Sequence, residues 1–128
     1  MHKQFNPGTI AAPFSRYSHG VEASGKARWL HISGQVGVRP DGTLAEGAKA
    51  QAEQAWRNLM AVLEAAGTSQ AHLVKVTAFL TRSEDVGIYR EVRDQVLASA
   101  RPASTMLIVP GLAHPDWLVE IEAIAAAG

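Results

Sequence analysis

The sequence predicts an α+β fold in which a mixed sheet of about six strands carries two helices on one face. Three observations predict this fold. Segments with the alternating periodicity of strands occupy both ends of the chain, two segments with helical periodicity lie between them, and one further strand separates the helices. The resulting order, β-β-β-α-β-α-β-β, describes one sheet layer with both helices on the same side.

The first expected strands lie before residue 40. His2 to Asn6 is a short opening strand, which the turn signal Pro7-Gly8 ends. A second strand, Tyr17 to Ala23, is followed by the tight-turn sequence Ser24-Gly25-Lys26 and by a third strand, Ala27 to Val38. Two strands joined by so short a turn are expected to form a hairpin.

Gly34 lies in the middle of the third strand, where it carries no side chain. A glycine there weakens a strand, and it marks either a bulge that serves sheet curvature or a place where another backbone or a ligand comes close. Both interpretations stay open. Strand alternation groups Gly34 with Leu30, Ile32 and Val36, and assigns the opposite face to Trp29, His31, Ser33 and Gln35.

Two helices are expected, one on each side of a strand. Apolar residues recur at three- and four-residue steps from Glu46 to Ala66, which is typical of an amphipathic helix, and Gly67 ends it. A strand follows from His72 to Leu80. The second helix begins at Ser83 and ends before Arg101-Pro102, and its buried stripe is expected to contain Val86, Tyr89, Val92 and Val96.

The chain closes with two strands, Ala103 to Val109 and Leu118 to Ala126. Alternation in the last strand places Glu120 and Glu122 on one face, opposite the apolar residues Val119, Ile121 and Ala123. An ionised carboxylate inside a sheet is costly unless it is paired or hydrogen-bonded. Glu120 lies deeper in the apolar run and is a candidate general base or water-positioning residue, whereas Glu122 also fits a place at the rim.

Composition limits the classes of function. The 128 residues fit a single domain, spanning residues 1–128. Lys and Arg number 12 and Asp and Glu number 12, so no broad charged surface for nucleic acid or an anionic membrane is expected. The absence of cysteine fits a reducing compartment, and Pro7, Gly8 and Pro13 break up the N-terminus before any signal peptide or membrane span, so a cytoplasmic location is expected.

No cofactor or metal site is expected. None of the histidines stands at helical ligand spacing with an acid, and the glycine-rich stretches are turns rather than phosphate-binding loops. The sheet face opposite the helices is expected to be open, and apolar side chains on it would form a patch larger than a soluble monomer usually tolerates. A ring-like homo-oligomer is therefore expected, with small-ligand sites in the grooves between subunits.

Six segments of the chain together carry a family resemblance. They are Tyr17 with Gly20-Val21, Ser33-Gly34-Gln35-Val36, Gln54 to Gly67, Val74 to Leu80, Arg101-Pro102-Ala103-Ser104-Thr105, and Val119 to Ala125. In this order and at these spacings they resemble the RidA/YjgF proteins, described as reactive-intermediate deaminases, over nearly the whole chain. The resemblance implies a chorismate-mutase-like fold, a homotrimer whose central barrel is made from the sheets, and three clefts at the subunit interfaces.

The resemblance also implies roles for individual residues. In active members a glutamate of the last strand positions water, and this residue matches Glu120. An N-terminal tyrosine and the backbone around the strand glycine line the cleft, and they match Tyr17 and Gly34. Thr105 matches the second residue of a Ser-Thr or Ser-Cys pair, which a substrate-binding arginine precedes in those members.

That arginine does not match. Deaminase-type members read Pro-x-Arg-Ser, whereas this chain reads Pro102-Ala103-Ser104. Alanine cannot replace the two charge-assisted hydrogen bonds that a guanidinium makes to a carboxylate. Arg101, Arg16 and Arg90 are the candidate substitutes, although each also fits a surface position, and His19 is a further candidate for the cleft lining.

Two functions follow. The resemblance implies a hydrolase that deaminates enamine or imine metabolites, with Glu120 positioning the water and Tyr17 and Thr105 orienting the substrate. The missing arginine leaves open a non-catalytic trimer that binds a small metabolite or regulates partner proteins. Some family members are described as ribonucleases or translation inhibitors, but the balanced charge and the lack of a ribonuclease-type histidine pair argue against nucleic acid as a partner.

Overall fold

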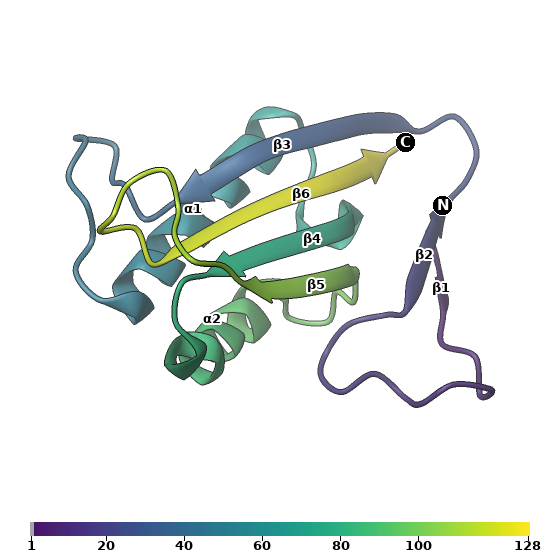
Figure 1. The fold of residues 1–128 in the computed structure, drawn as a ribbon. Coiled ribbons are helices and arrows are strands. Elements are labelled where there is room, and N and C mark those ends of the chain that lie inside the picture. The colour runs from purple at the N-terminus through teal and green to yellow at the C-terminus, as the bar shows by residue number, and fades with distance from the viewer. Residues whose placement is uncertain (1) are drawn as a thin grey trace.

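The structure, a computed structural model, describes residues 2–128. Its main sheet has four strands: β3 (Arg28–Val36), β4 (Leu73–Leu80), β5 (Ala103–Ile108) and β6 (Val119–Ala127). They lie in the order β3-β6-β4-β5 (Figure 1). β6 pairs antiparallel with β3 and β4, and β4 pairs parallel with β5, so the sheet is mixed.

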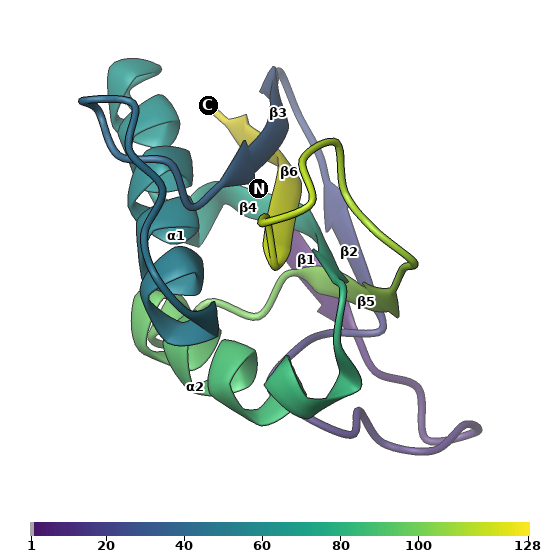
Figure 2. The same cartoon turned by 60° about the vertical axis from the view of Figure 1, so that its left-hand side comes forward.

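Two helices, α1 (Ala48–Ala65) and α2 (Val86–Leu97), lie side by side on one face of this sheet (Figure 2). Short 3₁₀ turns at Gln70–His72 and Ser83–Asp85 precede β4 and α2. The predicted α+β fold, with about six strands and both helices on one face, is confirmed. None of the helices in residues 2–128 is long and apolar enough to cross a membrane.

The two remaining strands, β1 (His2–Phe5) and β2 (Gly20–Ala23), pair antiparallel in a ribbon beside the four-stranded sheet (Figure 1). The predicted hairpin is wrong, because β2 pairs with β1 and β3 pairs with β6. The reason is the length available for pairing: β2 has four residues, whereas β3 and β6 have nine each.

The helix-facing side chains of β4 and β6 build the core. On β6 they are Val119, Ile121 and Ala123, all buried as alternation predicts. The helices pack onto this layer with long apolar side chains, the buried ones being Trp56, Leu59 and Leu63 of α1 and Tyr89, Val92 and Leu97 of α2. Periodicity therefore identified the buried side of β6 and α1, whereas in α2 it identified Tyr89 and Val92 but missed the buried Leu97.

The start of α1 lies directly against the chain that follows β3. A Cβ added to Gly37 would lie 2.6 Å from the Cα of Gln51, a backbone atom that cannot swing away. The buried Gln51 side chain donates to the Asp116 carbonyl (Nε2–O 3.1 Å) and accepts from the Leu118 amide (Oε1–N 2.8 Å). Gly37 thus permits the contact through which α1 anchors the loop before β6.

We expect Gly37→Ala to lower the free energy of unfolding by about 1–3 kcal/mol, because overpacking against a backbone atom forces α1 outward. Gly87→Ala is the matched control, since a Cβ added there meets nothing within 4 Å, and it should be at least as stable as the wild type. Urea denaturation at one protein concentration measures both variants. Equal stability of the two would contradict the tight contact with Gln51.

The face opposite the helices, called here the helix-free face, mixes apolar and charged side chains. Strand by strand it carries Trp29 and His31 of β3, Glu120, Glu122 and Ile124 of β6, Lys75, Thr77 and Phe79 of β4, and Thr105 and Leu107 of β5. Trp29 and Leu107 are 52% and 44% exposed. Large apolar side chains therefore remain uncovered on this face of a single chain.

Candidate functional site

β3 contains a bulge between Ile32 and Gln35. Beyond the bulge the strand alternation is reversed, so that Val36 pairs with Glu120 and lies on the helix-free face. This corrects the predicted grouping of Val36 with Leu30 and Ile32. A single inserted residue is enough to exchange the faces, because successive side chains of a strand point to opposite sides.

Gly34 lies within this bulge and directly under Glu120. A Cβ added to Gly34 would lie 2.7 Å from Cδ and 3.1 Å from Cγ of Glu120, so the glutamate side chain fills the space that a larger residue would need. The interpretation of Gly34 as a bulge residue is confirmed. Within the chain, the group that lies close to Gly34 is the carboxylate of Glu120.

The Glu120 carboxylate has unused acceptor capacity. It is half-buried, and among the described residues it accepts no hydrogen bond and forms no ion pair. It borders a cavity of about 250 Å³, whose lining also includes Phe79, Val109, Leu112 and Glu122. A carboxylate with free lone pairs beside apolar walls is suited to hold a water molecule and to accept a proton from it.

Lys75 brings a cation to the helix-free face, next to the position where the arginine is missing. Lys75 and Ala103 are direct partners in the β4–β5 pair, and the Lys75 ammonium donates to the Thr105 hydroxyl (Nζ–Oγ1 2.6 Å). Thr77 of β4 pairs with Thr105 on one side and with Glu122 on the other, so these three residues lie in one row across the sheet. Lys75 is not among the site residues predicted from the sequence, because its proximity to Ala103 depends on a strand register that periodicity does not fix.

Tyr17 lies on the helix side of the sheet rather than beside Glu120. It lines a cavity of about 180 Å³ with Arg90 and Arg93 of α2 and Ser104 of β5. Ser104 turns toward the helices, whereas its neighbours on β5 face the other way. Within one chain, the structure therefore separates Tyr17 from Glu120.

Arg16 and His19 belong to the same N-terminal loop as Tyr17. Arg16 Nε lies 3.9 Å from the carboxylate of Asp94 on α2. His19 packs edge-on against the Tyr17 ring with 5.9 Å between centroids, and its Nε2 lies 2.7 Å from the Ala11 carbonyl oxygen. In a single chain these contacts fix the shape of the loop and hold it on α2.

Arg101 closes the end of α2. Its Nη1 donates to the carbonyl oxygens of Ala98 and Ala100, both at 2.8 Å, which satisfies acceptors that a helix end leaves free. Its own carbonyl accepts from the Ser18 hydroxyl at 2.5 Å. Arg101 therefore has a local structural use, and it does not line the cavity beside Glu120.

Two histidines outside the candidate site also have local structural uses. His72 Nδ1 accepts from the Ser69 amide (3.1 Å), and His114 Nδ1 accepts from the Asp116 amide (3.1 Å). Within residues 2–128, no group of three or more His, Asp or Glu side chains is arranged to hold a metal ion.

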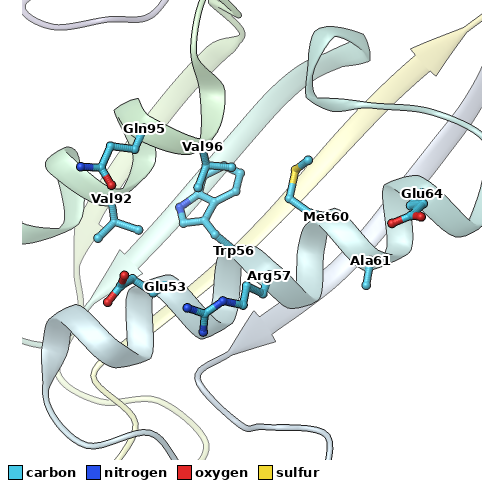
Figure 3. A pocket seen from close by; sticks show the side chains of 9 residues that line it. All are labelled: Glu53, Trp56, Arg57, Met60, Ala61, Glu64, Val92, Gln95 and Val96. Atoms are coloured by element: carbon cyan, nitrogen blue, oxygen red, sulfur yellow. The ribbon is translucent and has the colours of Figure 1, made fainter.

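A groove of about 340 Å³ runs between α1 and α2 on the other side of the molecule (Figure 3). Trp56 points from α1 toward Val92 and Val96 of α2 and is fully buried, as expected for a core residue. Its indole N–H faces the buried Tyr89 hydroxyl without reaching hydrogen-bond geometry, and burial raises the pKa of Tyr89 above its ordinary value. The floor of this groove is therefore helix packing rather than a reactive arrangement.

The chain is similar to one group of proteins in both sequence and structure. Residues 9–127 match the family model described as Endoribonuclease L-PSP. A RutC family protein of Aquifex aeolicus (strain VF5) is 40% identical over 116 residues, which cover 88% of this chain and 90% of that protein. The 2-iminobutanoate/2-iminopropanoate deaminase of Mus musculus is 36% identical over 119 residues, covering 91% and 85%. The crystal structure of YyfB from Yersinia pestis, a protein of unknown function of the conserved Rid family, has a TM-score of 0.85 at 30% identity and covers 98% of both chains.

Proposed function

Because the chain belongs to the RidA/YjgF family, we propose that it is a hydrolase that releases ammonia from imine or enamine metabolites, with Glu120 positioning the attacking water. The observation that carries this proposal is the Glu120 carboxylate, unpartnered among the described residues and bordering a cavity. The relative from Mus musculus that is named as an imine deaminase supports the reaction type.

Hydrolysis of an imine needs a group that moves protons beside the reacting carbon. Water adds to the carbon of the C=N bond while a proton passes through the Glu120 carboxylate to the nitrogen, which gives a carbinolamine. A second proton then passes from the new hydroxyl to the nitrogen. The C–N bond breaks, the C=O bond forms and ammonia leaves, so one carboxylate in the right place serves both steps.

Ammonia release from freshly generated 2-iminopropanoate tests this proposal. A rate clearly above the spontaneous hydrolysis in the same buffer supports a deaminase. A rate equal to the spontaneous one contradicts it for this substrate class.

Closure of the helix-free face by three copies of the chain is part of the proposal. The exposed Trp29 and Leu107 support this closure, because large apolar side chains exposed on one face of a sheet are stabilised when another chain buries them. Tyr17 and Glu120 lie on opposite sides of the sheet, so a cleft that contains both must draw Tyr17 from a neighbouring copy. Such a trimer would act in the cytoplasm on a small metabolite, without a cofactor or nucleic acid.

The substrate carboxylate is proposed to bind Lys75 and Thr105 in place of the absent arginine. We expect Lys75→Met to raise KM for 2-iminopropanoate by about tenfold or more, because a hydrogen bond to a charged group contributes roughly 1.5–3 kcal/mol. Steady-state ammonia release measures the change.

Lys75→Arg is the matched control, since it keeps the charge and should leave KM near the wild-type value. Adding Ala103→Arg to the Lys75→Met variant should restore binding, because Ala103 is the direct partner of Lys75 across the β4–β5 pair. An unchanged KM in Lys75→Met would remove Lys75 from the substrate site and leave the role of Glu120 intact.

A second function, a non-catalytic trimer that binds a small metabolite, is favoured by one observation, the alanine at position 103. Thermal shift measurements against small organic acids, followed by analysis of the ligand afterwards, separate the two functions. A binding protein is stabilised and returns the ligand unchanged, whereas a hydrolase yields ammonia and a carbonyl compound.

A further inference from the structure

Three amide side chains lie in a row on α1, among apolar neighbours of the core. Gln51 and Gln54 are buried and Asn58 is half-buried. Steps of three and four residues place all three on one side of the helix. Burying an amide is costly unless its donors and acceptors are hydrogen-bonded. Each of the three has partners, and those of Asn58 include the end of β3, the strand that contains the bulge.

Asn58 holds two backbone carbonyls with one amide group. Its Nδ2 donates to the carbonyl oxygens of Val36 (3.0 Å) and Val38 (2.9 Å), which uses both of its N–H bonds. The carbonyl of Gly37, between them, accepts from the Ala45 amide at 2.9 Å. Three consecutive carbonyls at the end of β3 therefore have partners outside the four-stranded sheet, and two of them share the Asn58 side chain.

A series of hydrogen bonds along α1 fixes the direction of the Asn58 amide. Arg57 Nη1 donates to Gln54 Oε1 (3.2 Å), and Gln54 Nε2 donates to Asn58 Oδ1 (2.9 Å). A guanidinium can only donate and a backbone carbonyl can only accept. Neither amide can turn over without losing hydrogen bonds at both of its ends, so Asn58 presents its NH₂ group to β3.

The segment that Asn58 holds lies next to Glu120 in the sheet. Val36 pairs with Glu120 in the β3–β6 pair, and the bulge that contains Gly34 lies directly before this pair. A bulge interrupts the ladder of hydrogen bonds, and β3 is an edge strand of the four-stranded sheet, so only β6 pairs with it there. Asn58 gives this end of β3 a second support, from the helix side.

We propose that Asn58 is a positioning residue for the Glu120 carboxylate. It fixes the end of β3, and through the pairing of Val36 with Glu120 it keeps the carboxylate in place above the bulge. Asn58 does not line the cavity beside Glu120, so its effect on the reaction is indirect. This role rests on the proposed function of Glu120 and adds to it the residue that holds the bulged strand.

Asn58→Leu tests the proposal, because leucine is similar in size and lacks both donors. We expect kcat for ammonia release from 2-iminopropanoate to fall by about tenfold or more, because displacing a catalytic group slows the chemical step. KM should stay within about twofold of the wild-type value, since the proposed carboxylate site at Lys75 and Thr105 lies on other strands. In a Glu120→Gln background the same substitution should cause no further loss.

Thr68→Val is the matched control. The half-buried Thr68 hydroxyl donates to the Leu63 carbonyl (2.8 Å) at the end of α1, away from the bulge. Its loss should lower the unfolding temperature and leave kcat unchanged. If Asn58→Leu does not fold, Gln54→Met takes its place, because it removes the hydrogen bond that orients Asn58 and should cause a smaller loss in kcat.

An unchanged kcat in the folded variant, or an equal further loss in the Glu120→Gln background, would overturn the proposal. NMR spectra provide a test that needs no substrate. The side-chain carboxyl signal of Glu120 and the amide signals of Gly34 and Val36 should move in Asn58→Leu and stay in place in Thr68→Val.

These spectra separate the two proposals. If the wild type releases no ammonia but the signals move, the hydrolase is contradicted while Asn58 still positions the carboxylate. If kcat falls while the Glu120 signal stays in place, Asn58 is rejected as a positioning residue and the hydrolase stands.

Discussion

Glu120→Gln is expected to slow ammonia release from 2-iminopropanoate by about 100-fold or more. The amide keeps the size of the side chain but cannot take a proton from water at neutral pH. The wild-type carboxylate has no hydrogen bond or ion pair among the described residues, so the substitution removes a proton acceptor without breaking a polar interaction. We therefore expect the loss in kcat while the unfolding temperature stays near that of the wild type.

Glu122→Gln is the matched control for this prediction. Glu122 is the next residue on the same face of β6, it lines the same cavity and it is exposed. Its substitution removes the same charge from the same surface and should change the rate little. Equal losses in the two variants would show a general effect of charge, and full activity in Glu120→Gln would place the proton acceptor elsewhere.

Gly34→Ala is expected to reduce kcat by about 100-fold, although it changes no group that takes part in the chemistry. The added methyl group would lie 2.7 Å from Cδ of Glu120, so the carboxylate must move away from the position that it holds above the bulge. A displacement of about 1 Å in a catalytic group can have an effect of this size. Ammonia release measures the loss, and circular dichroism shows whether the fold is kept.

Gly111→Ala is the control for Gly34→Ala, since Gly111 lines the same cavity and a Cβ added there meets nothing within 4 Å. It should retain wild-type activity. In the double variant Gly34→Ala/Glu120→Gln the two losses should not add, because both act through the same carboxylate. Additive losses would mean that Gly34 contributes by a separate route, and a fully active Gly34→Ala would refute the positioning of Glu120 by the bulge.

The long periodic elements of this fold could be predicted from the sequence alone. In β6 strict alternation identified the buried side and placed Glu120 and Glu122 together on the other. In α1 three- and four-residue steps identified the helix to within two residues at its start and one at its end. These patterns are local, because each reports which side of one element is apolar.

Pairings between distant segments could not be predicted in this way. The hairpin of the second and third strands was wrong, because β6, the better partner for β3, lies at the other end of the chain. The bulge at Gly34 exchanged the faces beyond it, and the contacts of Lys75 with Ala103 and Thr105 depend on the register of β4 and β5. Periodicity also gave no sign that Arg93 of α2 would be buried against the N-terminal loop.

Each proposed role on the helix-free face depends on its closure by further copies of the chain. Native mass spectrometry measures this closure directly. We predict a particle of three times the 13.7 kDa mass of one chain, without a populated monomer at micromolar concentration. A mass of one chain under the same conditions would contradict the closure and leave Trp29, Leu107 and Glu120 on an open surface.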